Sequence, residues 1–207
     1  MAIKNDHIEK FRRDCLSDIS FFAENNVAPL YIAPEEGPVA RVKLRRVQDR
    51  LAEAVNRQWF NRGFLRIVVC KARRIGSTTF FSMDAYRQAS LRPNTNVVVG
   101  AQLDEMASEI HKRNHIFYNN YPVSLRPERS IFTERTPLAR TGATIQYLLL
   151  SEFAKYRNQS TIIKEMFPTV RKNTGAIVID TTAESRGDSY SRLWEEAVAG
   201  RSEFEPL

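Results

Sequence analysis

The chain has 207 residues, of which 43% are hydrophobic and 27% charged, and it carries a formal net charge of +7. Its apolar runs are too short to span a membrane, its charged start lacks the apolar core of an export signal, and its two cysteines are too few for a disulfide or zinc framework. We therefore expect a cytoplasmic protein built as one large domain, or as one domain with an appendage.

The first 40 residues are expected to form an N-terminal extension. Residues 1–26 repeat apolar side chains at helical spacing, which predicts one amphipathic helix. Residues 27–40 contain three prolines and a glycine, so an extended connector over the surface is predicted there. Residues 41–207 are interpreted as the main domain.

A basic block covers residues 41–74, which hold eleven lysines or arginines and two acidic residues. Such a block indicates a polyanionic partner, either a nucleotide or a nucleic acid, although a solvated basic face explains it equally well. A helix is predicted within this block at about 44–61. Its Gln48 offers paired donor and acceptor groups that match the edge of adenine; the alternative is an exposed helical glutamine.

A buried-strand pattern over residues 64–70 leads into the stretch KARRIGSTT, and a helix is predicted from about 77 to 91. Phosphate groups bind at such a junction, because the free N–H groups of a helix start, the helix dipole and nearby cations converge there.

Compared with the phosphate-loop pattern G-x-x-x-x-G-K-[ST], Lys71 replaces the first glycine, Gly76 keeps the second, and Thr78 keeps the hydroxyl. Ser77 stands where the pattern has its lysine, and the cations lie upstream instead. For this stretch taken alone, the alternative is a basic surface turn that leads into a helix.

Further strands are predicted at 96–101, 144–150 and 175–180, and further helices at about 102–119, 159–167 and 189–199. Residues 120–143 are rich in proline and arginine and are expected to be irregular. Strands that alternate with helices indicate an α/β fold with a parallel sheet and helices on both faces. Ligands of such sheets bind beyond the carboxyl ends of the strands, where three polar turns are expected to meet: KARRIGST, SEFAKY and TTAESRGD.

These turns contain a candidate for each part of a nucleoside triphosphatase. The backbone of residues 72–78 would cradle the phosphates, and Thr78 would offer its hydroxyl to Mg²⁺. Lys71 and Arg74 would neutralise the phosphate charge. Glu152, directly past a buried strand, would orient the attacking water; the alternative for such a residue is a helix cap.

Three runs, KARRIGSTT, TIQYLLLSEFA and VIDTTAESRGDSYSRLW, resemble in order and spacing the ATPase domain of the large terminase subunit of tailed bacteriophages, over about residues 44–207. That family is the DNA-packaging motor. The resemblance implies a P-loop NTPase fold of the additional-strand (ASCE) type. Together with the elements predicted above, the expected architecture is a mostly parallel central sheet flanked by helices on both faces, with an N-terminal helical extension.

The resemblance also implies roles for single residues. Gln48 matches the family's adenine-contacting glutamine and Glu152 its catalytic carboxylate, while Arg140 is interpreted as an arginine finger for a neighbouring subunit, with Arg135 as the alternative. The Walker A loop corresponds to Lys71, Ala72, Arg73, Arg74, Ile75, Gly76, Ser77, Thr78 and Thr79, and the coupling motif that senses the γ-phosphate corresponds to Thr181, Thr182 and Ala183.

Ser151 occupies the position before Glu152 where an aspartate is usual in the Walker B motif. By the same resemblance, Mg²⁺ would be held by Thr78 and by Ser151, either through the serine hydroxyl or through a water molecule. ATP and Mg²⁺ are therefore the expected cofactors.

The functional expectation is an enzyme that hydrolyses ATP to move double-stranded DNA into a procapsid, with the portal protein and the small terminase subunit as partners. It would form a homo-oligomeric ring during packaging, be monomeric in isolation, and work in the bacterial host cytoplasm without a membrane partner. Residues 201–207 match the start of the family's linker, so the C-terminal nuclease domain and its activity are expected to be absent. The alternatives are a helicase-like nucleic-acid ATPase and a basic DNA-binding module with a degenerate phosphate loop.

Overall fold

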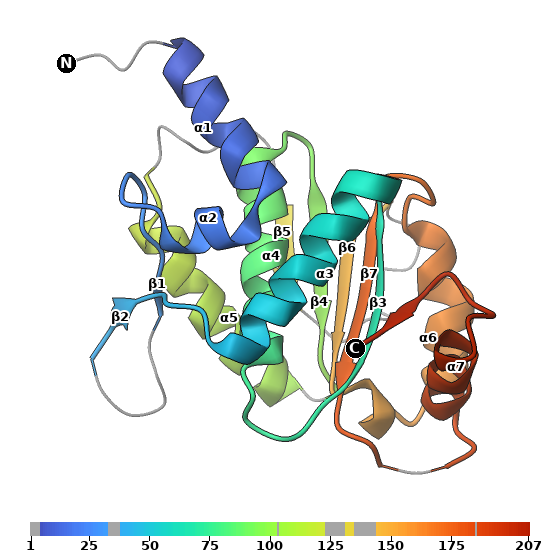
Figure 1. The fold of residues 1–207 in the computed structure, drawn as a ribbon. Helices are drawn as coiled ribbons and strands as arrows, with labels where there is room; N and C mark the ends of the chain where they lie inside the picture. The colour runs from blue at the N-terminus through green and yellow to red at the C-terminus, as the bar shows by residue number, and fades with distance from the viewer. Residues whose placement is uncertain (1–4, 33–37, 103, 123–130, 135–143, 185) are drawn as a thin grey trace.

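A single six-stranded sheet forms the centre of the computed structural model, which describes residues 5–32, 38–102, 104–122, 131–134, 144–184 and 186–207. The strand order is β5-β4-β6-β7-β3-β8, and every neighbouring pair is parallel (Figure 1). The strands are β3 (Leu65–Cys70), β4 (Asn96–Gly100), β5 (Ile131–Glu134), β6 (Tyr147–Ser151), β7 (Ala176–Thr181) and β8 (Glu205–Pro206).

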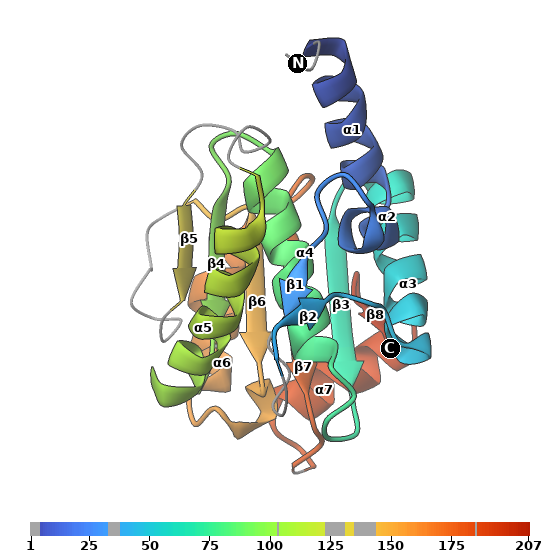
Figure 2. The same cartoon turned by 90° about the vertical axis from the view of Figure 1, so that its left-hand side faces the viewer.

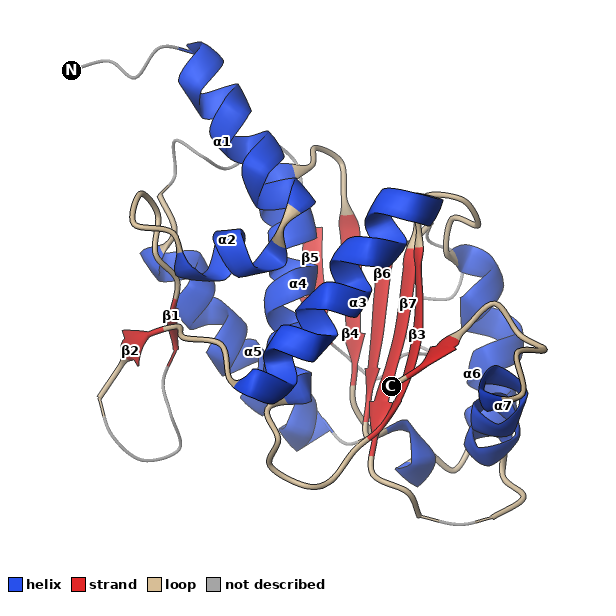
Figure 3. Ribbon diagram, in the orientation of Figure 1, coloured by secondary structure: helices blue, strands red, loops and turns tan. Residues whose placement is uncertain are grey.

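Helices cover both faces of the sheet, which is why its central strands are apolar along their whole length. Ile67 and Val69 of β3 point into one core, whereas Val68 between them points into the other. One face is covered by α3 (Arg46–Arg62), α4 (Ser77–Leu91) and α5 (Asp104–Asn120), and the other by α6 (Gln159–Met166) and α7 (Ser189–Val198) (Figures 1 and 3). The predicted α/β fold with helices on both faces is confirmed.

The N-terminal extension packs beside α3 and α4 (Figure 2). It contains two helices, α1 (Asn5–Ser17) and α2 (Ile19–Glu24), so the prediction of one helix over residues 1–26 was wrong. The break occurs at Asp18, whose extended backbone (φ −136°, ψ 114°) ends α1 and whose carboxylate accepts a hydrogen bond from the Ser20 N–H at 2.8 Å. An aspartate that caps a new helix in this way stops the preceding one.

The described part of the predicted connector over residues 27–40 contains no helix and has bends at residues 27, 28 and 38. There the chain forms two short antiparallel strands, β1 (Tyr31–Ile32) and β2 (Ala40–Arg41). Residues 33–37 lie outside the described part of the chain.

Most predicted elements of the main domain are confirmed within a few residues, and α4 has the predicted bounds. Two strands were missed. β5 lies in the stretch expected to be irregular, and β8 lies within residues 201–207, where its end is tied to β3 by a hydrogen bond from the Leu207 N–H to the Val68 carbonyl at 3.0 Å. Two short 3₁₀ helices, η3 (Phe153–Lys155) and η4 (Phe167–Thr169), follow β6 and α6.

In the described part of the chain, no helix combines the length and apolar character needed to cross a membrane.

Candidate active site

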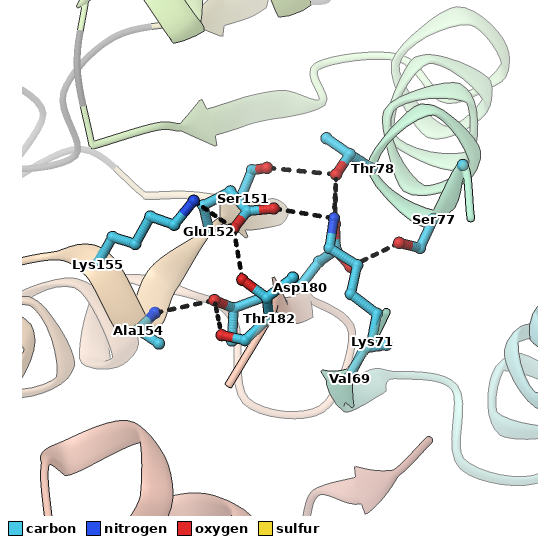
Figure 4. Close-up of polar contacts among 12 residues, drawn as sticks. Val69, Lys71, Ser77, Thr78, Ser151, Glu152, Ala154, Lys155, Asp180 and Thr182 are labelled. Atoms are coloured by element: carbon cyan, nitrogen blue, oxygen red, sulfur yellow. Dashed lines mark hydrogen bonds and ion pairs between the residues drawn. The ribbon is translucent and has the colours of Figure 1, made fainter. Parts of the chain in front are cut away.

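Three strands deliver polar side chains to one edge of the sheet. Cys70 at the end of β3 pairs with Thr181 of β7, and Ser151 at the end of β6 pairs with Asp180 of β7. Since all three strands are parallel, the residues that follow them emerge at the same edge, as Figure 4 shows for Lys71, Glu152 and Thr182. The sequence prediction that three polar turns meet at one rim is therefore confirmed.

The turn after β3 contains two residues with left-handed backbones, Arg74 (φ 62°) and Gly76 (φ 82°). Gly76 is the N-cap of α4, and its lack of a side chain leaves the first N–H groups of this helix without a side-chain cap. Ala72, Arg73 and Arg74 are exposed, and Ile75 and Thr79 are partly buried. A turn of this kind presents backbone donors and cations at the positive end of a helix dipole.

Lys71 points into the rim. Its side chain is only 8% exposed, and its Nζ lies 2.9 Å from the Thr78 hydroxyl and 3.1 Å from one carboxylate oxygen of Glu152 (Figure 4). The same ammonium is 3.1 Å from a carboxylate oxygen of Asp180. Lys71 therefore joins the ends of all three strands through charge-assisted contacts.

Asp180 was not among the predicted site residues. Its carboxylate is fully buried and accepts hydrogen bonds from the Ser77 hydroxyl at 2.8 Å and from the Thr78 hydroxyl at 2.5 Å. In the sequence Asp180 is the last residue of an otherwise apolar strand run, GAIVID. An aspartate at the end of a strand does not by itself indicate a functional site. Only the register of β6 against β7 places it beside Ser151.

Glu152 adopts a left-handed backbone (φ 55°, ψ 40°), which is uncommon for a residue with a side chain and is often found at functional sites. It is the N-cap residue of the 3₁₀ helix η3, but its side chain makes no capping hydrogen bond. The carboxylate instead contacts Lys155 at 3.1 Å and accepts a hydrogen bond from the Thr182 hydroxyl at 3.2 Å. Glu152 thus occupies the helix-cap position of the alternative explanation, but its carboxylate is engaged by the site and not by the start of η3.

The charge state of Glu152 follows from these contacts. Burial acts to raise the pKa of this carboxyl, but the ammonium groups of Lys71 and then Lys155 outweigh it, so the pKa lies below its ordinary value. The carboxylate is thus ionised at neutral pH and can accept a hydrogen bond from a water molecule.

The oxygen atoms around Thr78 are of the kind that Mg²⁺ prefers. The Ser151 hydroxyl, which is buried, lies 3.4 Å from the Thr78 hydroxyl, and the Asp180 carboxylate contacts the same Thr78 oxygen at 2.5 Å. Among the described residues no group of three or more His, Cys, Asp or Glu side chains could cage a metal by itself. Mg²⁺ is usually bound through one or two carboxylates together with substrate phosphates, so these residues fit that ion.

The predicted coupling residues lie beside Glu152. The Thr181 hydroxyl accepts a hydrogen bond from the Ala154 N–H at 3.1 Å and donates to the Thr182 carbonyl at 3.0 Å, while Ala183 is exposed. The end of β7 is thereby tied to the turn that carries Glu152.

Gln48 is buried rather than exposed, because its side-chain amide holds the turn. The Nε2 donates to the Gly76 carbonyl at 3.0 Å, and the Oε1 accepts from the Arg45 N–H at 3.0 Å. A cavity of about 120 Å³ lies against this amide and is lined also by Val42, Leu44 and Phe80. Arg140 and its alternative Arg135 lie outside the described residues.

No protein-family model and no curated protein sequence matches this chain. Solved structures do match. The large terminase of bacteriophage HK97 superposes with a TM-score of 0.69 at 18% identity, over 92% of this chain and 43% of the terminase chain. The ATPase domain of the large terminase of Thermus phage P74-26, in two structures of which one is a point mutant, superposes with a TM-score of 0.55 at 15% identity, over 80% of both chains.

The chain therefore has the fold of the ATPase domain of phage large terminases. It spans less than half of the HK97 protein, since only 43% of that chain is covered.

Proposed function

We propose that this chain is the ATPase domain of a phage large terminase subunit, which hydrolyses ATP to drive double-stranded DNA into a procapsid. The observation that carries the proposal is the meeting of Lys71, Thr78 and Glu152 at one edge of the sheet. These residues supply a cation, a hydroxyl and an ionised carboxylate, which are the parts that phosphoryl transfer to water requires. The shared fold with two phage terminases supports the same assignment.

In the proposed complex, the triphosphate lies over the start of α4. The backbone N–H groups of residues 72–78 hold the phosphate oxygens. Lys71 supplies the ammonium group that the phosphate-loop pattern would have at the position of Ser77. The exposed side chains of Arg73 and Arg74 add positive charge on the open side of the turn. The base occupies the cavity beside Gln48, whose amide keeps one unused hydrogen and one unused lone pair for adenine.

Hydrolysis then depends on Glu152 and Thr78. The Thr78 hydroxyl would hold Mg²⁺, which would neutralise part of the charge of the phosphates. Lys71 turns from Glu152 towards the phosphates, because a triphosphate offers more negative charge than a carboxylate. The freed carboxylate of Glu152 holds a water molecule in line with the γ-phosphorus; the water oxygen forms the new P–O bond, the bond to the leaving diphosphate breaks, and the water proton passes to Glu152 or to a phosphate oxygen.

The conformational change that follows loss of the γ-phosphate is transmitted to the DNA-binding part of the motor through Thr181, Thr182 and Ala183. The hydrogen bond from the Thr182 hydroxyl to Glu152 gives this segment a direct contact with the reacting groups. We propose that the chain works in a ring docked on a procapsid in the bacterial host cytoplasm, with the portal protein and the small subunit as partners. Arg140, or Arg135 in its place, would complete the site of a neighbouring subunit, so the isolated chain is expected to be a slow ATPase.

The decisive experiment replaces Glu152 by alanine. The variant is expected to bind ATP with nearly unchanged affinity, measured by calorimetry, and to lose hydrolysis, measured by phosphate release. Glu165→Ala, which removes an exposed carboxylate from α6, serves as the matched control and is expected to keep both. Undiminished turnover in Glu152→Ala would remove Glu152 from its role.

The same measurements separate the alternatives. A basic DNA-binding module with a degenerate loop would bind DNA in a salt-sensitive way and show no ATP binding at all. A helicase-like ATPase would unwind a forked duplex without a portal.

A further inference from the structure

Asp180 is a buried carboxylate between the two hydroxyls of the phosphate loop. We infer that Asp180, on β7, supplies the carboxylate toward Mg²⁺ that the β6 strand lacks at Ser151; this inference rests on the proposed function. In P-loop ATPases the metal is held by the loop hydroxyl and by an aspartate at the end of the Walker B strand. Here that strand ends in Ser151 and Glu152, and the aspartate stands one strand away.

The register of the sheet allows an aspartate on β7 to take the place of an aspartate on β6. Ser151 and Asp180 are direct partners in adjacent parallel strands, so the two positions are separated by about 5 Å, the spacing between neighbouring strands. One Asp180 oxygen contacts the Thr78 hydroxyl at 2.5 Å, and the Ser151 hydroxyl contacts the same Thr78 oxygen at 3.4 Å. A carboxylate on β7 therefore reaches the loop hydroxyl as a carboxylate on β6 would.

The charge balance of the site also calls for a cation at Asp180. Its side chain is fully buried, and Lys71 is the cation that contacts it within the described part of the chain. Lys71 is shared with Glu152, which has Lys155 as a second partner. When Lys71 turns to a triphosphate, Glu152 keeps Lys155, whereas Asp180 is left as a buried charge without a cation, a costly arrangement. A divalent cation bound at Thr78 would compensate it.

A purely structural role is the competing explanation, since the same carboxylate accepts hydrogen bonds from Ser77 and Thr78 and could simply fix the loop. The two roles differ in how binding depends on the metal. A fixing role affects nucleotide binding with and without Mg²⁺, whereas a metal-directed role affects only the gain that Mg²⁺ brings.

The test measures binding of the non-hydrolysable ATP analogue AMP-PNP by calorimetry, in Mg²⁺ and in EDTA, for the unaltered chain and for Asp180→Asn. We expect the gain in affinity from Mg²⁺ to fall by about tenfold or more in the variant, as is typical for loss of a group that supports a bound metal. Affinity in EDTA should stay the same or rise, because removal of a negative charge frees Lys71 for the phosphates. Equal losses in both conditions, or an unchanged gain from Mg²⁺, would overturn the inference.

Two further variants sharpen the result. Glu165→Gln makes the same chemical change on the exposed side of α6 and is expected to match the unaltered chain. The double variant Ser151→Asp/Asp180→Asn returns the carboxylate to β6 and is expected to recover much of the gain from Mg²⁺; a folded double variant without such recovery would count against the exchange. If the unaltered chain bound no nucleotide in either condition, the proposed function itself would fail.

Discussion

The ammonium of Lys71 lies 3.1 Å from the carboxylate of Glu152, although the two residues belong to different turns at the ends of β3 and β6. The lysine precedes the loop glycine, Gly76, instead of following it, and yet its side chain reaches the loop hydroxyl of Thr78 at 2.9 Å. The phosphate-binding region therefore receives its buried cation from the residue at the start of the turn, and not from the residue after the loop glycine.

Replacing Lys71 by methionine should weaken nucleotide binding. Charge-assisted hydrogen bonds contribute about 1.5–3 kcal/mol each, so the dissociation constant for ATP is expected to rise by about tenfold to a hundredfold. Calorimetric titration with ATP and Mg²⁺ measures the change. Lys155→Met is the matched control, since Lys155 contacts the other oxygen of Glu152 at the same 3.1 Å but lies outside the phosphate turn. Equal losses in the two variants would show that Lys71 acts only through Glu152.

The loss of stability caused by Lys71→Met should depend on pH. Because Lys71 and Lys155 depress the pKa of Glu152 in the folded chain, this carboxyl contributes stability above its unfolded pKa of about 4.3, and the contribution is lost as pH falls through the lower folded value. In Lys71→Met the burial of Glu152 acts with less opposition and its pKa rises. The destabilisation caused by Lys71→Met should therefore be largest near neutral pH and shrink below about pH 4. Urea denaturation at both pH values measures it, and a destabilisation that grew on acidification would contradict the sign.

The elements that sequence reasoning located best are those defined by local patterns. The helix α4 starts at Ser77 because Gly76 takes a left-handed backbone, and it ends near Pro93, so both of its bounds can be read from a few residues. The strands β3, β6 and β7 are long apolar runs between polar turns, which predicts both their positions and the edge at which their turns meet.

The features that sequence reasoning missed depend on contacts between distant segments. Asp180 gains its importance from the pairing of β7 with β6 and from the hydroxyls of α4, and nothing in its own neighbourhood indicates either. The strand β8 is only two residues long and exists because β3 offers it an edge. The break at Asp18 was missed because apolar spacing continues across it, while the capping hydrogen bond that stops α1 is a single local contact.

Replacing Gln48 by alanine should destabilise the phosphate turn even without nucleotide. The Gln48 amide caps the start of α3 through the Arg45 N–H and is one of two donors to the Gly76 carbonyl, which also accepts from the Phe80 N–H, so its loss removes two part-buried hydrogen bonds that tie α3 to the phosphate turn. We expect the free energy of unfolding to fall by about 1–2 kcal/mol, the usual cost of losing a helix cap. Urea denaturation of the nucleotide-free chain measures this. A variant with weaker ATP binding but unchanged stability would show that Gln48 contacts the adenine base and does not stabilise the phosphate turn.

Arg87 is expected to hold the N-terminal helices on the main domain. It is fully buried on α4, lies 2.6 Å from the carboxylate of Asp84, and donates hydrogen bonds to the carbonyls of Cys15 and Leu16 in the last turn of α1. Tyr147 of β6 donates to the other oxygen of Asp84 at 2.9 Å. Because Arg87→Met leaves Asp84 as an unpaired buried charge, the free energy of unfolding should fall by about 3–5 kcal/mol.

The control for this prediction removes the charge partner as well, and Cys15 reports on the position of α1. Arg87→Met/Asp84→Leu should recover much of the lost stability, because the buried Asp84 carboxylate is removed together with its ion-pair partner. Cys15 is fully buried and burial raises its pKa to about 12, so in a Cys70→Ser background its thiol should resist labelling at neutral pH. Both Arg87 variants lack the hydrogen bonds to α1, so both should label faster at Cys15 than the background chain, while only the single variant is strongly destabilised. Labelling at the background rate in both variants would show that α1 is held by its apolar contacts alone.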